Sequence, residues 1–219
     1  MGRTVKFIDF FAGVGGFRRG MELAGHECVG FCEFDKFATA SYTSMHLLTP
    51  EQRDSMGKMS LKQRQKEILK EEYRNGEWYA NDIRRVYAGD IPKADCWCFG
   101  FPCQDISVAG KQLGFQGNRS SLFFRVMYLI GQLEEEDKPT YLFIENVKNL
   151  LSVNGGWDFA RLLIEMEQGG TMQNGKCSTL KTSECLKIEK GCSLSDILEA
   201  ETLQKYFLSK EQTEKIVFR

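Results

Sequence analysis

A cysteine at the end of an apolar run is the residue in this sequence best suited to chemistry. Residues 95–101 are mostly apolar, as is typical of a short buried strand, and Pro102 ends the run just before Cys103. In an open parallel α/β sheet, ligands bind at the carboxyl ends of the strands. A thiol at that edge can act as a nucleophile as well as fill space in the core. The sequence therefore offers Cys103 as a candidate nucleophile.

A carboxylate stands in a similar place at the end of a second apolar run. Residues 140–144 read as a strand, and Glu145 follows directly. Solvent exposure is the ordinary environment of a glutamate. The position directly after a short apolar strand nevertheless favours a role in a site, at the same sheet edge as Cys103.

A glycine-rich turn near the N-terminus has the features of a nucleotide-binding unit. A strand, a turn with Gly13, Gly15 and Gly16, a helix and a second strand that ends at Glu33 follow one another within residues 6–33. The glycines let the backbone approach a ligand, and the acid can hold ribose hydroxyls. The glycines do not form a complete G-x-G-x-x-G pattern, so it is the acid that favours ligand binding over a plain turn.

Asp90 and a long polar loop add hydrogen-bonding groups. Asp90 lies on a turn before the Cys103 run, where capping the turn and accepting an adenine amino group are equally open. The loop 104–121 is polar and contains several glycines, and loops of this length are usually functional or disordered. Its Lys111 and Arg119 are suited to binding phosphate.

These positions require a scaffold in which strands and helices alternate. The expected strands are 6–12, 27–32, 95–101 and 140–144, and the expected helices are 17–24, 37–48, 122–133 and 156–166. This alternation predicts an α/β fold with a Rossmann-like sheet and helices on both faces. Residues 51–74 carry mixed charges, which favours a solvated helical insertion over about 47–80.

Length and composition fit one globular domain, residues 1–170, followed by a short C-terminal remnant, residues 171–219, that is not an independent domain. The 219 residues carry a net charge of −1, so there is no overall basic signature. Because no signal core or membrane-length apolar stretch is found, we expect a cytoplasmic location and no membrane partner. The eight cysteines include no CxxC pair, so reduced thiols are favoured over a zinc site of Cys177, Cys185 and Cys192, and no metal is expected.

Together these motifs resemble those of the DNA cytosine-5 methyltransferase family. The matching segments follow the family order over most of residues 5–168, and the Pro-Cys-Gln and Glu-Asn-Val pair is the most specific; the segments are 7–17, 33–36, 89–91, 100–104, 107–115 and 145–149. The resemblance implies S-adenosylmethionine as methyl donor, cytosine in double-stranded DNA as acceptor, and a nucleotide-binding type of sheet. It implies an enzyme of the restriction-modification or phage type.

The chemistry of such a reaction suits the two candidate residues. A thiolate of Cys103 that adds to carbon 6 of cytosine makes carbon 5 able to accept a methyl group. Glu145, as a carboxylic acid whose pKa is raised in a dry site, can protonate or hydrogen-bond nitrogen 3. The base must leave the duplex first, because carbon 6 is not otherwise accessible to the thiolate.

The resemblance also implies which residues contact the cofactor and the DNA. Glu33 is expected on the ribose, Phe34 against the adenine and Asp90 on the adenine amino group. The full set of expected cofactor contacts is Phe11, Ala12, Gly13, Gly15, Gly16, Glu33, Phe34, Asp90, Ile91, Pro102 and Leu122. The expected DNA contacts are Gln104, Ser107, Lys111 and Arg119.

The sequence departs from the family pattern after residues 145–147. A Gln-Arg-x-Arg-type motif, a target-recognition domain and a closing Gly-Asn segment are not found, and the chain resembles a member with an internal deletion and an early end. Three hypotheses follow. The first is a methyltransferase, active alone or with a second polypeptide that supplies target recognition. The second is a catalytically inactive fragment that binds cofactor or DNA. The third is an RNA methyltransferase on the same scaffold.

Overall fold

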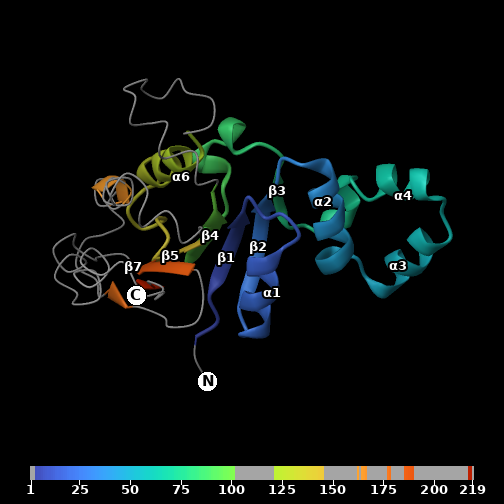
Figure 1. Ribbon diagram of the computed structural model, residues 1–219, viewed down its shortest axis with the longest axis horizontal. Coiled ribbons are helices and arrows are strands. Elements are labelled where there is room, and N and C mark those ends of the chain that lie inside the picture. Colours follow the sequence, from blue (N-terminus) through green and yellow to red (C-terminus); the bar gives the residue numbers. More distant parts are fainter. Residues whose placement is uncertain are drawn as a thin grey trace, which may run out of the picture.

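A six-stranded sheet forms the centre of the molecule in the computed structural model (Figure 1). The structure describes residues 3–101, 121–145, 162, 164–166, 177–178, 185–189 and 217–218. The strand order is β3-β2-β1-β4-β5-β7, and the first five of these strands run parallel while β7 is antiparallel to β5. Their bounds are Lys6–Phe10 (β1), Glu27–Cys32 (β2), Trp78–Ala80 (β3), Cys96–Gly100 (β4), Tyr141–Glu145 (β5) and Cys185–Glu189 (β7). The predicted α/β sheet is confirmed.

Helices on opposite faces explain why the central strands are mostly apolar. Helix α1 (Gly16–Leu23) packs through Phe17 and Met21 against the face that carries Phe7. Helix α6 (Ser121–Gly131) packs against the other face, in the cluster that contains Ile8 and Phe10. Strands that are covered on both faces need apolar side chains at consecutive positions, as β4 has and as β1 has apart from the buried Asp9.

The helix expected over 37–48 is present in two parts. Helix α2 (Lys36–Tyr42) begins where the Asp35 side chain accepts hydrogen bonds from the first backbone N–H groups, as a good N-cap does. It continues into the π-helical turn η1 (Thr43–Leu47). The side chains of Arg74 and Asn75 bond to Thr43 and Leu47 of this turn, which fixes it against the segment that leads into β3.

The segment expected as a helical insertion contains helices α3 (Pro50–Gly57) and α4 (Leu61–Glu67) and the 3₁₀ turn η2 (Glu71–Arg74). In Figure 1 the two helices extend away from the sheet beyond α2. The buried apolar side chains of this segment form a separate cluster, made of Leu48, Met56, Ile68 and Tyr73. The strand β3 lies within the same range and was not predicted, because three half-buried residues form too short a pattern.

The C-terminal segment also contributes a strand that was not predicted. Strand β7 lies beside β5 in the main sheet, and β6 (Cys177–Ser178) pairs with β8 (Val217–Phe218) in a sheet of two strands. Leu162 and residues 164–166 are helical, within the helix expected at 156–166. Residues 194–199 and 206–211, two short segments with an amphipathic sequence, lie outside the described residues. No helix of the described part is long and apolar enough to cross a membrane.

Candidate functional site

The carboxyl ends of the parallel strands bring several of the predicted residues to one edge of the sheet. Phe11 follows β1, Glu33 follows β2, and Glu145 is the last residue of β5. Strands β3 and β4 end at the same edge because all five strands run in the same direction. This is the edge at which open α/β sheets bind ligands.

The turn between β1 and α1 has a backbone that few residue types adopt. Phe11, Gly13 and Gly15 have φ angles of 54°, 55° and 85°, in the left-handed region. A bulky residue such as Phe11 is rare there, and the strain costs of order 1 kcal/mol or more. The turn is held by hydrogen bonds from the Gly15 N–H to Ala12 O (2.8 Å) and from the Ala12 N–H to Cys32 O (3.1 Å).

Gly13 and Gly15 serve different purposes in this turn. A Cβ atom on Gly15 would overlap Nε2 of His46 and would lie 2.7 Å from its Cδ2 atom. The ring of His46 is held there by a 2.9 Å hydrogen bond between Nε2 and the carbonyl oxygen of Val14. A Cβ atom on Gly13 would meet nothing within 4 Å. Gly15 therefore makes room for the protein's own histidine, and Gly13 leaves space beside the turn.

Glu33 is joined directly to the glycine turn. Its carboxylate accepts a hydrogen bond from the Gly13 N–H (2.8 Å) and another from the Asp35 N–H (2.7 Å). An ionised carboxylate has about four acceptor positions, so Glu33 can still accept further hydrogen bonds such as those of ribose hydroxyls. The structure thus brings Gly13 and Glu33 together; their contact with a cofactor stays a prediction.

A second carboxylate, Asp82, lies beside Glu33 and was missed by the sequence reasoning. Its side chain is 10% exposed, and it follows the edge strand β3, which pairs with β2. The Glu33 N–H donates to the carbonyl oxygen of Ala80, two residues before Asp82. Burial, and then the charges of Glu33 and Asp82, raise the pKa of the Cys32 thiol to about 12. Hydrogen bonds from Arg84 hold the pKa of Asp82 below its usual value, so Asp82 is ionised at neutral pH.

Phe34 and Asp90 differ in how well they suit an adenine site. The ring of Phe34 is 72% exposed, and the guanidinium of Arg84 lies over it, 5.5 Å from the ring centre. Asp90 ends the 3₁₀ turn η4 (Ala88–Asp90) and is exposed. Since Arg84 contacts both Phe34 and Asp82, Asp82 is the carboxylate that the structure places next to this ring. The strand that ends two residues before Asp82 is too short to be recognised from the sequence, so no local signal identified this residue.

Glu145 lies opposite Gly100, and Gly100 is the last residue of β4, the strand that leads toward Cys103. The two residues are paired in the register of β4 and β5. Glu145 is partly buried, and a Cβ atom on Gly100 would lie 2.8 Å from its Oε2 atom. The absence of a side chain at Gly100 therefore provides the space that this carboxyl group occupies.

The remaining predicted residues divide into those that pack in the core and those that the structure does not describe. Ile91 is buried, and Phe11 and Leu122 pack against the same core cluster. Ala12 is buried in another cluster, with Phe31 and Tyr42. The predicted residues that lie outside the described residues are Pro102, Cys103, Gln104, Ser107, Lys111 and Arg119. Among the side chains that the structure describes, none form a group of three or more metal ligands; the side chains of Cys177, Cys185 and Cys192 are not among them.

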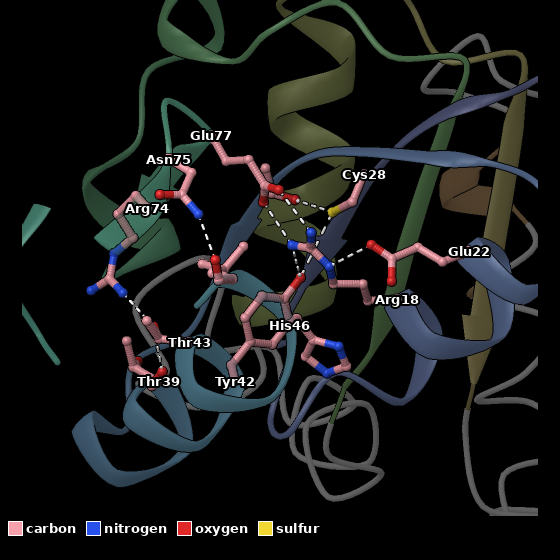
Figure 2. A network of polar contacts seen from close by, with 12 residues as sticks. Arg18, Glu22, Cys28, Thr39, Tyr42, Thr43, His46, Arg74, Asn75 and Glu77 are labelled. Atoms are coloured by element: carbon pink, nitrogen blue, oxygen red, sulfur yellow. Dashed lines mark hydrogen bonds and ion pairs between the residues drawn. The ribbon is translucent and has the colours of Figure 1, made fainter. Parts of the chain in front are cut away.

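A buried ion pair holds the helix after the glycine turn against the segment before β3 (Figure 2). The Nη1 and Nη2 atoms of Arg18 donate to the two carboxylate oxygens of Glu77 at 2.6 and 2.7 Å, and Nε donates to Glu22 at 2.8 Å. The Tyr42 hydroxyl accepts a longer bond of 3.4 Å from Nη1. The pair joins α1, which follows the glycine turn, to the residue just before β3, the strand that leads to Asp82. No sequence pattern indicated this contact.

Comparisons with known proteins agree with this arrangement. A family profile, "C-5 cytosine-specific DNA methylase", matches residues 5–69 and 53–185. The chain is 37% identical over 152 residues to the Type II methyltransferase M.HhaI of Haemophilus parahaemolyticus, covering 69% of this chain and 36% of that protein. It is 34% identical over 157 residues to the Type II methyltransferase M.HaeII of Haemophilus aegyptius, covering 72% of this chain and 39% of the relative.

A solved structure shows the same fold at lower identity. The S. pombe Dnmt2 methyltransferase aligns with a TM-score of 0.51 and 16% identity, over 81% of this chain and 45% of that one. In the two sequence comparisons above, the chain spans little more than a third of the length of each curated relative. The family profile nevertheless matches well over half of this sequence. On that evidence the chain belongs to the family of C-5 cytosine-specific DNA methylases.

Proposed function

We propose that this chain forms the cofactor-binding and catalytic part of a DNA cytosine-5 methyltransferase. The proposed reaction transfers a methyl group from S-adenosylmethionine to carbon 5 of a flipped-out cytosine in double-stranded DNA. The two curated relatives are named Type II methyltransferases, which supports a role in a restriction-modification system.

The observation that carries this proposal is the pairing of Gly100 with Glu145. It sets a carboxyl group at the carboxyl edge of the sheet, beside the strand that leads to the candidate nucleophile. Gly100 precedes Cys103 by three residues, and three residues of chain reach at most about 11 Å. A thiol and a carboxylic acid that act on two sides of one pyrimidine ring need to be neighbours of this kind.

The residues of the glycine turn fit the adenosyl part of the proposed cofactor. Gly13 leaves open space, and Glu33 next to it has acceptor positions for ribose hydroxyls. Phe34 offers an exposed ring for stacking, and we propose Asp82 in place of Asp90 as the acceptor for the adenine amino group. When bound, S-adenosylmethionine supplies a methyl group on a sulfonium sulfur, which is open to attack by carbon.

The chain's own residues perform the remaining chemistry of this proposal. The thiolate of Cys103 forms a bond to carbon 6 of cytosine, and the displaced electron pair makes carbon 5 nucleophilic. Glu145 donates a proton or a hydrogen bond to nitrogen 3 and so stabilises the adduct. After methylation, loss of the proton from carbon 5 returns the electron pair that breaks the carbon–sulfur bond and releases Cys103.

Two assays test the catalytic half of the proposal. Duplex DNA that contains 5-fluorocytosine should form a covalent complex with the chain in the presence of S-adenosylmethionine, and Cys103→Ala should not form it. Cys28→Ala is the matched control, since this thiol is buried on the α1 face and burial raises its pKa to about 12. Methyl transfer from tritiated S-adenosylmethionine by Cys103→Ala would refute the mechanism.

The same tritium assay separates the hypotheses that the sequence left open. Transfer by the chain alone supports a complete catalytic unit. Transfer only after addition of a candidate second polypeptide supports a split enzyme, and cofactor binding without transfer under either condition supports an inactive fragment. Transfer to RNA but not to duplex DNA would support the third hypothesis.

Calorimetric titration with S-adenosylhomocysteine tests the cofactor half. Asp82→Asn removes one acceptor of a charge-assisted hydrogen bond and should weaken binding about tenfold. Asp90→Asn makes the same chemical change at an exposed site and should leave the affinity within about twofold. The reverse order would show that Asp90, as the sequence predicted, is the adenine acceptor.

A further inference from the structure

Arg84 contacts both groups that the proposed function assigns to adenine. Its Nε and Nη2 atoms form a fork on the Asp82 carboxylate, at 2.8 Å from Oδ1 and 2.9 Å from Oδ2. The backbone N–H of Arg84 also donates to Oδ1, at 3.0 Å. The same guanidinium lies 5.5 Å from the ring centre of Phe34. One planar cation thus bonds the carboxylate and covers part of the aromatic ring.

The hydrogen bonds of Asp82 leave one acceptor position. Oδ1 accepts two bonds from Arg84 and Oδ2 accepts one. Because an ionised carboxylate has about four such positions, the hydrogen bonds within the described part of the chain leave a single position, on Oδ2. The Nε atom of Arg85 is 4.0 Å from Oδ2, beyond hydrogen-bonding distance. The exocyclic amino group of a purine can donate one N–H to this position on Oδ2.

We propose that Arg84 is a positioning residue that makes the site selective for a 6-aminopurine. The fork fixes the direction of the free Oδ2 lone pair relative to the ring of Phe34, so that stacking and the amino hydrogen bond are satisfied by the same base. A purine with a carbonyl group at carbon 6 would place an oxygen against the carboxylate and be repelled. This inference rests on the proposed use of an adenosyl cofactor.

A contribution to stability alone would explain less of this geometry. The Arg84 side chain is 47% exposed, and exposed ion pairs stabilise a fold weakly. Arg84 and Asp82 are also only two residues apart, so their pairing joins no distant elements. The contact between Arg84 and Phe34 is different, because Phe34 belongs to the loop after β2 and is a residue of the candidate site.

The test compares two ligands that differ only at carbon 6 of the purine. The affinities of the wild-type chain for S-adenosylhomocysteine and for its inosyl analogue are measured by calorimetry, and the ratio of the two dissociation constants defines the selectivity. Arg84→Ala should weaken adenosyl binding about tenfold and lower the selectivity at least about fivefold, because a freely rotating carboxylate discriminates poorly. Arg84→Lys keeps the charge but not the fork, and should recover less than half of the lost selectivity.

Arg85→Ala is the matched control, since it also removes one positive charge, from a side chain that is 83% exposed. It should leave both affinities within about twofold. The Arg84→Ala change should also be smaller in a Phe34→Leu background, because the two residues act on the same base. If Arg84→Ala lowers both affinities equally, Arg84 has only a structural role and the inference is wrong. If the wild-type chain binds neither ligand, the proposed function itself fails.

Discussion

The buried ion pair between Arg18 and Glu77 gives the sharpest prediction about what holds the site together. The two side chains are 6% and 20% exposed, and two hydrogen bonds of 2.6 and 2.7 Å join them (Figure 2). Arg18→Met removes the cation and keeps much of the apolar stem that packs beneath it. Glu77→Leu removes the anion at similar volume. The double variant removes both charges.

The expected magnitude follows from the burial of the pair. Two unit charges about 4 Å apart attract with about 4 kcal/mol at an effective dielectric constant of about 20. Removing one partner of a buried pair costs about 3–5 kcal/mol, and partial access of water to Glu77 favours the lower value, about 3 kcal/mol for Arg18→Met. This is a large part of the roughly 5–15 kcal/mol that stabilises a domain, yet it leaves the chain folded. The double variant should cost less than Arg18→Met alone, because no carboxylate of Glu77 remains to be hydrated.

Urea unfolding followed by circular dichroism at 25 °C measures these free energies. The pair between Lys58 and Asp54 is the control: its atoms also approach to 2.6 Å, but the side chains are 74% and 72% exposed. Lys58→Ala should leave the unfolding midpoint unchanged within error. If the effects of Arg18→Met and Glu77→Leu add in the double variant, the two residues are not coupled and the reasoning is refuted.

Two further predictions concern Glu145 and the buried Asp9. Gly100→Ala places a methyl group 2.8 Å from the position of Glu145 Oε2, so the carboxyl group must move. Covalent complex formation with 5-fluorocytosine DNA should slow at least about tenfold while the affinity for S-adenosylhomocysteine is kept; an equal loss of both would indicate general misfolding instead. Burial raises the pKa of Asp9, whose oxygens are fully enclosed, so the folded chain binds this proton more tightly than the unfolded chain. The stability from Asp9 is therefore present below its unfolded pKa of about 3.9 and lost as pH rises through the folded pKa. Asp9→Asn should flatten this decline of the unfolding free energy, measured with urea between about pH 4 and 8. An unchanged dependence on pH would contradict the protonation of Asp9 in the folded chain.

The sequence predicted most of the elements that carry the site. The strands before Gly13 and Glu145 and the helix after Gly16 were expected close to their observed bounds, because apolar runs bounded by glycine, proline and acids are local signals. Gly13 and Glu33 were expected at the same edge of the sheet, since they follow neighbouring strands of one βαβ unit, but the hydrogen bond between them was not predicted.

Other parts could not be predicted because their signals are not local. Strand β3 is only three residues long, and its place in the sheet depends on pairing with β2. The role of Gly15 was expected to be an approach to ligand, but its missing side chain accommodates the ring of His46. Strand β7 comes from a segment without clear periodicity and is fixed by its pairing with β5.

The sequence by itself determined the alternation of strands and helices, the glycine turn with its acid, and the motifs of the methylase family. These features need only the order of residues along short stretches of chain. The tertiary structure alone decided which carboxylate stands beside Phe34. Asp82 and Asp90 are each followed by an isoleucine in the sequence, but only Asp82 follows the strand that pairs with β2, where the Glu33 N–H donates to the carbonyl oxygen of Ala80.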